Sequence, residues 1–389
     1  MSRVGFGLVL TAIVVAIPAT AQSSLASRVA QSSDGVVRLE YASRPGVCGN
    51  GRDVVAYRHA IFGRSFESWG SWSGVACVAG PLRVSMAVSH GAPTRLRTQV
   101  GGTWPVTEEH VTDLGIVSSR EASVYFLSHV PALERESGRD RILLPAVLAA
   151  DAAVIAPLLA LARDHDRTDR TRRQAIQWLV LVGEDDGVSA VLGLSRDSSV
   201  EIRREALFWL GQSGDPIAIR RLHQVIEDKS EDTRVRSHAI FSLGNSDHTD
   251  AREFQYLRSV YPRLGDDRLS DAVFQAMAQD DAGGAWLVQR ARDSEEPVEL
   301  RKKALFWAGQ RDATRTADLV TVYRESRESS LREHAIFVLS QRGDDAATEA
   351  LMKIARDDDD RRMRGKALFW LAQKNDPRVT KLISDILVK

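Results

Sequence analysis

The stretch EALFWLGQ at residues 205–212 decides the fold, because copies of it return throughout the second half of the chain. The clearest copies are 303–310 (KALFWAGQ) and 366–373 (KALFWLAQ). Looser copies align on a shared alanine, which is Ala175, Ala206, Ala239, Ala272, Ala304, Ala335 and Ala367 in turn. These alanines are 31 to 33 residues apart. A period this steady predicts an array of structural repeats.

Length and charge limit the class of protein. The 389 residues are enough for two domains. A hydrophobic content of 43% and a charged content of 27% are ordinary for a folded soluble protein. Lys+Arg and Asp+Glu are both 52, so the formal net charge is zero and the chain lacks the basic excess of a nucleic-acid-binding protein. We expect no nucleic-acid partner.

The first residues have the pattern of a secretory signal peptide. Arg3 precedes the apolar run 4–17, Pro18 ends that run, and residues 19–21 (ATA) form a small-x-small cleavage site. The run is short for a membrane span, which needs about 20 apolar residues. A retained anchor is therefore the less favoured alternative. We expect residues 1–21 to be removed, no stable membrane span to remain, and the mature chain to reach a bacterial periplasm or be secreted.

Residues 35–117 differ from the rest of the chain and predict a small β-rich domain. Residues 22–34 are rich in Ser, Ala and Gln and indicate a linker before it. Residues 82–88 and 94–100 alternate apolar and polar side chains, with a turn cluster between them, which is typical of a β-hairpin. Trp69, Trp72 and Trp104 are expected in the core or at its edge. A ligand-binding platform is the alternative for Trp69 and Trp72.

Cys48 and Cys77 are the only cysteines in the sequence. In an exported chain, an even pair predicts a disulfide. The bond would close a loop of about 30 residues inside the β-rich domain. Two buried thiols are the alternative. A zinc site would need two further ligands, which this pair alone does not supply.

The remainder of the chain predicts helices. Residues 118–121 read S-x-x-E, the capping-box pattern that begins a helix, and 118–148 are expected to form a helical cap on the array. From 149 to 389 the pattern is helix, turn, helix, and the repeated motif is the second helix of each unit. The sequence thus predicts a mainly α protein, in which an α-solenoid of about seven helical hairpins follows the β-rich domain.

One face of the motif helix is built for packing. With the alanine as position 0, positions −3, 0, +1 and +4 share one side of a helix that turns about 100° per residue. Position −3 is arginine in all repeats except the fourth: Arg172, Arg203, Arg236, Arg301, Arg332 and Arg364. Aspartates precede it regularly: Asp169, Asp197, Asp232, Asp293 and Asp360. Because a buried arginine needs a partner, we predict an Arg–Asp ladder between repeats, with anion binding as the alternative.

Positions −1, +2 and +6 point away from the packing face and should line the inner, concave wall of the solenoid. Position +2 is Phe208, Phe241, Phe274, Phe306, Phe337 and Phe369, and position +6 is Gln212, Asn245, Gln310, Gln341 and Gln373. Position −1 includes His238 and His334, with Glu205, Lys303 and Lys366. Periodic aromatic residues usually stack in a core, which favours contacts between repeats. The alternative is a groove for a protein or peptide segment, and it makes the phenylalanines, glutamines and histidines the candidate partner-binding residues.

The motif and its period resemble HEAT repeats, specifically the short type named after phycobilisome lyases. The resemblance covers about residues 149–389 and rests on matches to (V/L)-R-x-x-A-L-F-W-L-G-Q. It implies a right-handed α-superhelix that acts as a protein-binding scaffold. The fourth repeat departs at −3, where it has Leu269, and at +6, so the superhelix is expected to be irregular there. The segment with the two cysteines is also similar to segments found ahead of such arrays in exported bacterial proteins.

No catalytic motif stands out, since G-x-S-x-G, H-E-x-x-H and Walker sequences do not occur. The acidic turns 164–169 and 357–360 match no metal-ligand spacing and are expected to cap helices instead. We expect no catalytic residue, metal or cofactor. The predicted function is an exported, non-enzymatic scaffold for a protein or peptide. The alternatives are an enzyme of the bilin-lyase kind, implied by the repeat's name, and ligand binding by the β-rich domain with the solenoid as spacer.

Overall fold

The computed structural model describes residues 24–52, 55–61, 64–68, 77–104, 110–137, 142–280, 282–374 and 376–387. The chain forms two compact units, the first made of 1–56 and 69–152 and the second of 57–68 and 153–389. The predicted signal segment 1–21, Trp69 and Trp72 lie outside the described residues. Among the helices that are described, none is long and apolar enough to cross a membrane.

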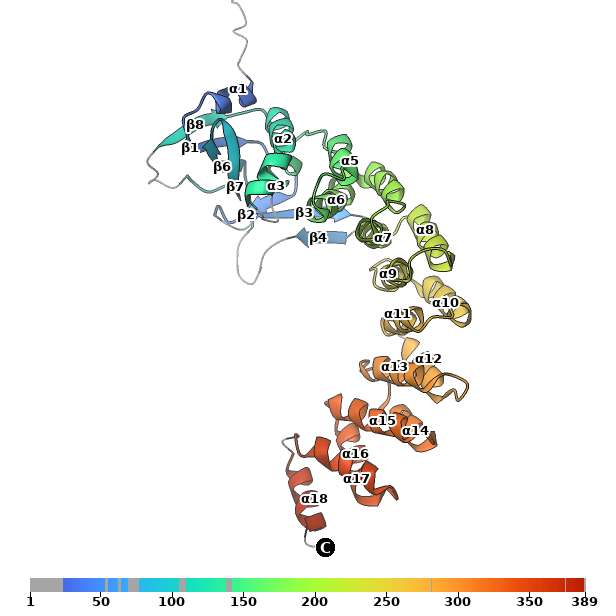
Figure 1. Ribbon diagram of the computed structural model, residues 1–389. Coiled ribbons are helices and arrows are strands. Elements are labelled where there is room, and N and C mark those ends of the chain that lie inside the picture. Colours follow the sequence, from blue (N-terminus) through green and yellow to red (C-terminus); the bar gives the residue numbers. More distant parts are fainter. Residues whose placement is uncertain are drawn as a thin grey trace, which may run out of the picture. The chain divides into compact units, whose positions relative to one another are not determined.

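The first unit is built on a four-stranded sheet with the strand order β7-β6-β1-β8 (Figure 1). Its strands are β1 (Gly35–Tyr41), β6 (Leu82–Ser89), β7 (Ala92–Val100) and β8 (Val111–Ile116). β1 runs antiparallel to β6 and parallel to β8. The predicted hairpin is β6–β7, and every second residue of β6 is buried, as the alternating sequence requires. One face of the sheet therefore carries the core of this unit.

The helices described in the first unit are α1 (Leu25–Ala30), α2 (Ser119–Ser128), α3 (Val130–Ser137) and α4 (Leu144–Val147). The Tyr41 ring lies 6.4 Å from the Phe126 ring, and its hydroxyl donates to the carbonyl of Pro145 at 2.6 Å. Residues 118–148 thus pack with the sheet and belong to the first unit. The capping box is absent, because Glu121 accepts a hydrogen bond from the backbone N–H of Leu25 instead.

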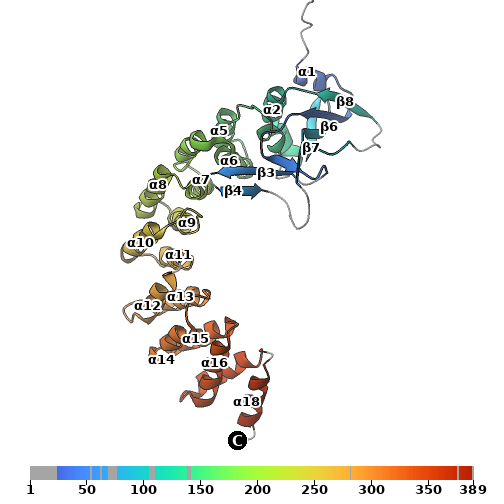
Figure 2. The same cartoon turned by 180° about the vertical axis from the view of Figure 1, so that it is seen from behind.

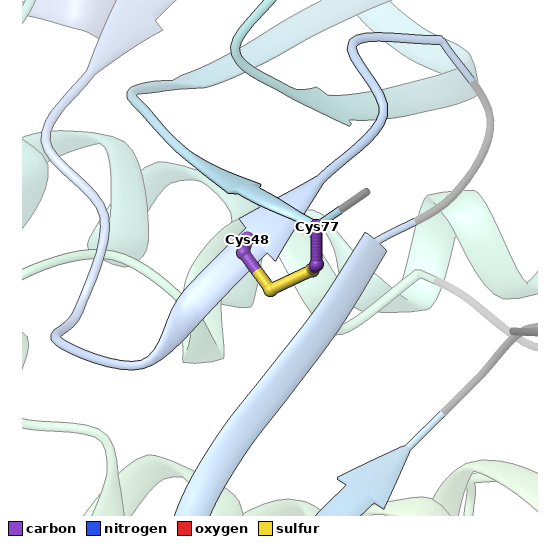
Figure 3. Close-up of a disulfide and its surroundings, with 2 residues drawn as sticks. All are labelled: Cys48 and Cys77. Carbon is purple, nitrogen blue, oxygen red and sulfur yellow. A yellow bond between two sulfur atoms is a disulfide. The ribbon is translucent and has the colours of Figure 1, made fainter. Parts of the chain in front are cut away.

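Cys48 lies within a short strand of the first unit, and Cys77 directly precedes the strand that pairs with it. β2 (Val47–Gly49) pairs antiparallel with β5 (Val78–Ala79), with Cys48 opposite Ala79. Cys48 and Cys77 form a disulfide, and their Cα atoms are 5.2 Å apart (Figure 3). The predicted small, disulfide-linked β-domain is confirmed. Trp104 is partly exposed, and the guanidinium carbons of Arg38 and Arg83 lie 5.3 and 5.9 Å from its ring centre. Because Arg38 and Arg83 belong to the two central strands β1 and β6, Trp104 lies over the sheet and neither in the core nor at the edge.

Most of a hairpin from the N-terminal region, residues 57–68, belongs to the second unit. It consists of β3 (Val55–Ile61) and β4 (Arg64–Ser68), which pair antiparallel. Tyr57 is buried, and its ring centre lies 6.2 Å from that of Trp178 in the first repeat. A terminal repeat has no preceding neighbour and needs its face covered. The hairpin contributes to that cover. The sequence, in contrast, predicts residues 35–117 as one domain and assigns the cap to residues 118–148.

The second unit is an α-solenoid with two rows of helices (Figures 1 and 2). The motif lies in α6 (Asp169–Leu194), α7 (Val200–Ser213), α9 (Thr233–Gly244), α11 (Asp267–Met277), α13 (Val298–Gly309), α15 (Ser329–Gln341) and α17 (Arg361–Leu371). The other row is α5 (Ile155–Arg163), α8 (Pro216–Glu227), α10 (Ala251–Val260), α12 (Gly283–Arg292), α14 (Thr316–Glu325), α16 (Asp345–Asp357) and α18 (Pro377–Leu387). The motif helices lie on the inner side of the curve, which confirms the predicted solenoid of about seven hairpins.

Local sequence explains where these helices begin. Asp215 accepts hydrogen bonds from the backbone N–H groups of Ile217 and Ala218, and Pro216 occupies the first turn of α8. Helical structure continues through residues 182–187, so α6 contains the motif of the first repeat and also residues 187–194 that follow it. A Cβ at Gly187 would lie 1.9 Å from the Leu179 carbonyl oxygen, so the backbone comes too close to itself for any other residue.

The packing face of the motif is buried as its pattern requires. The alanine at position 0 is fully buried in α7, α9 and α13, and so is the aliphatic residue that follows it. Small residues let neighbouring motif helices approach closely. At Gly244, near the end of α9, a Cβ would lie 2.3 Å from the Cβ of Ala276 in α11. The motif therefore specifies both the helix and its contact with the next repeat.

Candidate partner-binding wall

The arginine row joins neighbouring repeats. Arg172 is 3% exposed; its Nη2 lies 2.7 Å from Asp197, and its Nε donates to the carbonyl of Ala162 at 2.9 Å. In the fifth repeat, Arg301 donates to the carbonyl of Ala291 and pairs with Glu328 at 2.9 Å. Each of these cations ties the end of one outer helix to an acid in the following repeat. The row is thus engaged in structural contacts, which leaves the alternative of anion binding without support.

Most of the acids differ from those that the sequence suggested. Arg203 pairs with Glu231 at 2.8 Å, and Arg332 pairs with Asp358 at 2.7 Å. The predicted Asp232 caps the N-terminus of α9, where its side chain accepts a backbone N–H bond. The predicted Asp360 caps α17 in the same way, and it also lies 3.9 Å from Arg332 of the preceding repeat. The two remaining arginines of the row donate to backbone carbonyls. Arg236 donates to the carbonyl of Ile226, and Arg364 donates to that of Asp358. Asp293 pairs with Arg290 and Asp169 lies 3.9 Å from Arg172.

The phenylalanines at position +2 lie partly in the core and partly on the concave wall. Phe208, Phe241, Phe306 and Phe337 are half-buried. Phe208 lies 6.4 Å from His238 of the next repeat, and Phe337 lies 5.4 Å from Trp370 of the next repeat. Phe369 is 59% exposed. Stacking between repeats and an exposed aromatic edge are therefore both present at this position.

The two histidines at position −1 are aromatic partners of these rings. His238 stacks on Phe241 with ring centres 5.7 Å apart, and burial together with Arg204 lowers its pKa to about 4. His334 lies 5.7 Å from Phe337, and burial lowers its pKa as well. Both imidazoles are neutral near pH 7 because their pKa values lie below the ordinary one. They add uncharged ring surface to the wall.

The amides at position +6 follow the rings along the wall. Asn245, Gln310, Gln341 and Gln373 are exposed, and Gln212 is half-buried. Gln212 Nε2 donates to the carbonyl of Asn245 at 3.5 Å, and Gln373 Nε2 to that of Phe369 at 3.4 Å. These long hydrogen bonds show some capping of helix ends, as one of the predicted alternatives requires. Each of these amides nevertheless lies one helical turn after the +2 ring of its own repeat.

Tryptophans at position +3 are wall residues that the sequence analysis did not select. Trp307 and Trp370 are half-buried beside Phe306 and Phe337, with ring centres 5.3 and 5.4 Å away. The indole N–H of Trp307 donates to Asp271 at 3.0 Å. On a helix, position +3 is only about 100° from position +2. This small angle could have predicted from the sequence that the tryptophans border the wall.

The HEAT-repeat family model matches residues 189–278 and 284–372. These two segments consist of HEAT repeats. The predicted resemblance is confirmed for that part of the chain. No curated protein matches the sequence.

Solved HEAT-like structures resemble the chain only distantly. Human deoxyhypusine hydroxylase in complex with glycerol is 18% identical over 59% of this chain and 88% of that one, with a TM-score of 0.28. The CpcE–CpcF complex of phycocyanin lyase from Nostoc sp. PCC7120 is 18% identical over 64% and 97%, with a TM-score of 0.31. An engineered protein is 18% identical over 69% and 72%, with a TM-score of 0.27. Likenesses at these values carry no argument about activity.

The fourth HEAT repeat interrupts the wall. Phe274 is fully buried, with Tyr261 and Trp286 packed 5.3 and 5.9 Å from its ring. The +6 position is Ala278, which is also buried. The +2 and +6 positions of this repeat therefore present neither a ring nor an amide to solvent. The sequence marked it as irregular at −3 and +6, but the burial of Phe274 depends on side chains from two other helices.

The acidic turns between HEAT helices act as local hydrogen-bond acceptors. Asp164 accepts from the backbone N–H of Asp166 and from Arg167, which hold the pKa of its carboxyl below the ordinary value. Asp358 accepts from Tyr323 and Arg332, and its pKa is lowered too, although burial opposes the shift. In the part of the chain that the structure describes, no three His, Cys, Asp or Glu side chains form a metal-binding group.

Proposed function

We propose that the protein is a non-enzymatic scaffold that binds an extended segment of a partner protein along its concave wall. The observation that carries this proposal is the repeated pair of a half-exposed phenylalanine at +2 and an amide at +6. An aromatic ring supplies apolar contact area, and a primary amide supplies both donors and an acceptor. An extended peptide backbone needs this combination, because its N–H and C=O groups have no partners within the segment.

The spacing of the wall suits an extended chain. Packed helices lie about 8–10 Å apart, so neighbouring repeats present equivalent amides at about that interval. An extended peptide advances about 3.3 Å per residue, so each repeat corresponds to about three residues. Repeats that each contact a few residues in turn would build affinity from linked, modest interactions.

Charge contributes little to the proposed recognition. Lys303 lies 3.4 Å from Asp271, and Lys366 lies 3.6 Å from Glu333. These cations at −1 are thus balanced by acids of the preceding repeat. A wall with balanced charges favours a partner segment with apolar side chains over a strongly acidic or basic one.

Export is part of the same proposal. Residues 4–17 and the ATA sequence at 19–21 support a signal peptide, and the Cys48–Cys77 disulfide supports an oxidising compartment. Mass spectrometry of the protein from its native host should show a mature chain that begins at Gln22. A chain that begins at Met1 and keeps free thiols would contradict export.

Photocrosslinking in cells tests the scaffold directly. A benzoyl-phenylalanine at Phe306 should give a discrete crosslinked product, whereas the same residue at Ile217 should not. Ile217 is the matched control, because it is exposed and apolar but lies on α8 of the outer row. A product of equal yield from both positions, or from neither, would refute binding at the wall. Incubation with a bilin and an acceptor protein should leave the absorbance unchanged, and a covalent adduct would support the lyase alternative instead.

A further inference from the structure

We propose that the concave wall contains two half-sites separated by the fourth repeat, and that its ligand is one extended peptide with two apolar anchors about six residues apart. This inference rests on the proposed function and adds the form of the ligand to it. Its basis is the exposure of the wall residues, compared from repeat to repeat.

The first half-site lies on the second and third repeats. It contains Phe208 and Phe241, both half-buried, with His238 between them at 6.4 and 5.7 Å. Gln212 and Asn245 stand beside these rings. The neutral imidazole continues the apolar surface from one phenylalanine to the next.

The second half-site lies on the fifth to seventh repeats and is larger. Its rings are Phe306, Trp307, Phe337, Trp370 and Phe369, all of them at least partly exposed. Its amides are Gln310, Gln341 and Gln373, all exposed. Phe337 packs against Trp370 at 5.4 Å, so these rings form a continuous surface across two repeats. Such a surface suits an aliphatic or aromatic anchor.

The fourth repeat separates the two surfaces because its equivalent groups are used internally. Phe274 is enclosed by Tyr261 and Trp286, and the amide position is Ala278. Asp271 accepts a hydrogen bond from Trp307 and lies 3.4 Å from Lys303. A ligand that crosses this repeat meets Asp271, which is already paired, and finds no exposed ring at +2 that could hold one of its side chains.

The span of the gap sets the distance between the anchors. Phe241 and Phe306 are two repeats apart, which corresponds to about 16–20 Å at the usual distance between packed helices. An extended chain covers that distance in about five or six residues. In a helical ligand the backbone N–H and C=O groups bond to one another. The amides of both half-sites could then contact only the side chains of such a ligand. The amides therefore favour an extended ligand.

Two linked anchors should bind much more tightly than either alone. When one anchor is seated, the second one binds from a high effective concentration, and the gain is typically about 10²–10⁴-fold if the linker matches the span. A linker that is too short cannot reach, and the gain is lost. The dependence of affinity on anchor spacing is thus the property that distinguishes two half-sites from a uniform groove.

The test uses the full mature chain and fluorescein-labelled 16-residue peptides in a Ser/Thr host sequence. Each peptide carries one leucine anchor or two, and the separation of the two varies from two to ten residues. Fluorescence anisotropy should show the tightest binding at a separation of about six, at least about tenfold tighter than with one anchor. Phe241→Ala should reduce the two-anchor peptide to the level of the one-anchor peptide, whereas Ile217→Ala on the outer row should not change it.

The outcomes separate this inference from the function on which it rests. Binding that improves with two anchors but does not depend on their separation would overturn the half-sites and leave a uniform groove. A two-anchor peptide at the best separation that binds Phe241→Ala as tightly as the native chain would also overturn them. If no peptide binds to the folded protein, as judged by an unchanged circular dichroism spectrum, the proposed function itself fails.

Discussion

Replacing Arg301 by alanine tests whether the arginine row holds neighbouring repeats together. Arg301 is 5% exposed, its Nε donates to the carbonyl of Ala291 at 3.0 Å, and its Nη1 lies 2.9 Å from Glu328. Losing a hydrogen bond from a charged donor costs about 1.5–3 kcal/mol. Because the Glu328 side chain is 44% exposed, water replaces much of the ion pair, which adds at most about 1 kcal/mol. We expect Arg301→Ala to lower the free energy of unfolding by about 2–4 kcal/mol.

Urea unfolding followed by far-UV circular dichroism measures this loss. Hydrogen exchange should locate it in α13 and α15, because a repeat array transmits stability through nearest-neighbour interfaces. Arg292→Ala is the matched control. Arg292 and Glu325 form an ion pair with side chains that are 48% and 51% exposed, and removing such a pair costs less than about 1 kcal/mol.

Two results would refute the reasoning. If Arg301→Ala is no less stable than Arg292→Ala, the buried arginine does not hold the repeats together. If Arg301→Met is as stable as the native chain, the apolar stem of the arginine is what stabilises the interface, and its hydrogen bonds contribute nothing. Methionine tests this because it has a similar apolar stem and no N–H donors.

Three further predictions concern other parts of the chain. Gly244→Ala should destabilise the solenoid by about 1–3 kcal/mol, because the new Cβ meets Ala276, whereas Gly365→Ala in open space should stabilise it by about 0.5–1 kcal/mol; equal urea midpoints would contradict this. The pKa of His238 is about 4 when folded and about 6.5 when unfolded, so the unfolded chain binds the proton more readily and the stability should fall as pH drops through that range. His238→Phe should flatten this dependence in urea titrations at pH 7, 5.5 and 4.5, and an unchanged slope would count against it. Changing Cys48 and Cys77 together to serine opens a loop with a sequence separation of 29, and should cost the first unit about 3–4 kcal/mol in thermal unfolding; an unaltered melting curve would show that the bond does not stabilise it.

The burial of the row arginines could be predicted from the sequence, but their acidic partners could not. Arg172 and Arg301 recur on a face of alanine and leucine, so their burial and their need for acidic partners followed from the pattern alone. The identity of the acids did not. Glu231 and Glu328 lie 28 and 27 residues after the arginines that they contact, and the turn geometry decides which acid of several points inward. The nearby aspartates cap helices because their shorter side chains reach the backbone N–H groups.

For the candidate wall, the sequence predicts the positions of the residues but not their exposure. The positions of Phe208, Gln212 and their equivalents on the concave side follow from helical periodicity, which is a local property of the motif. Their exposure depends on neighbours that are distant in the sequence. Phe274 has the same place in the motif as Phe306, yet Tyr261 and Trp286 bury it and thereby interrupt the wall.

The sequence by itself determined the HEAT repeat, its packing face and the side of the helix that faces the concave wall. These features rest on contacts within one turn of a helix and on a period that repeats them, and both can be counted in a single chain. Only the tertiary structure decided that residues 118–148 join the sheet and that the hairpin with Tyr57 covers the first repeat. It also decided which wall residues stay accessible. Such contacts form wherever an apolar surface finds another of matching shape, and the matching partner can lie anywhere along the chain.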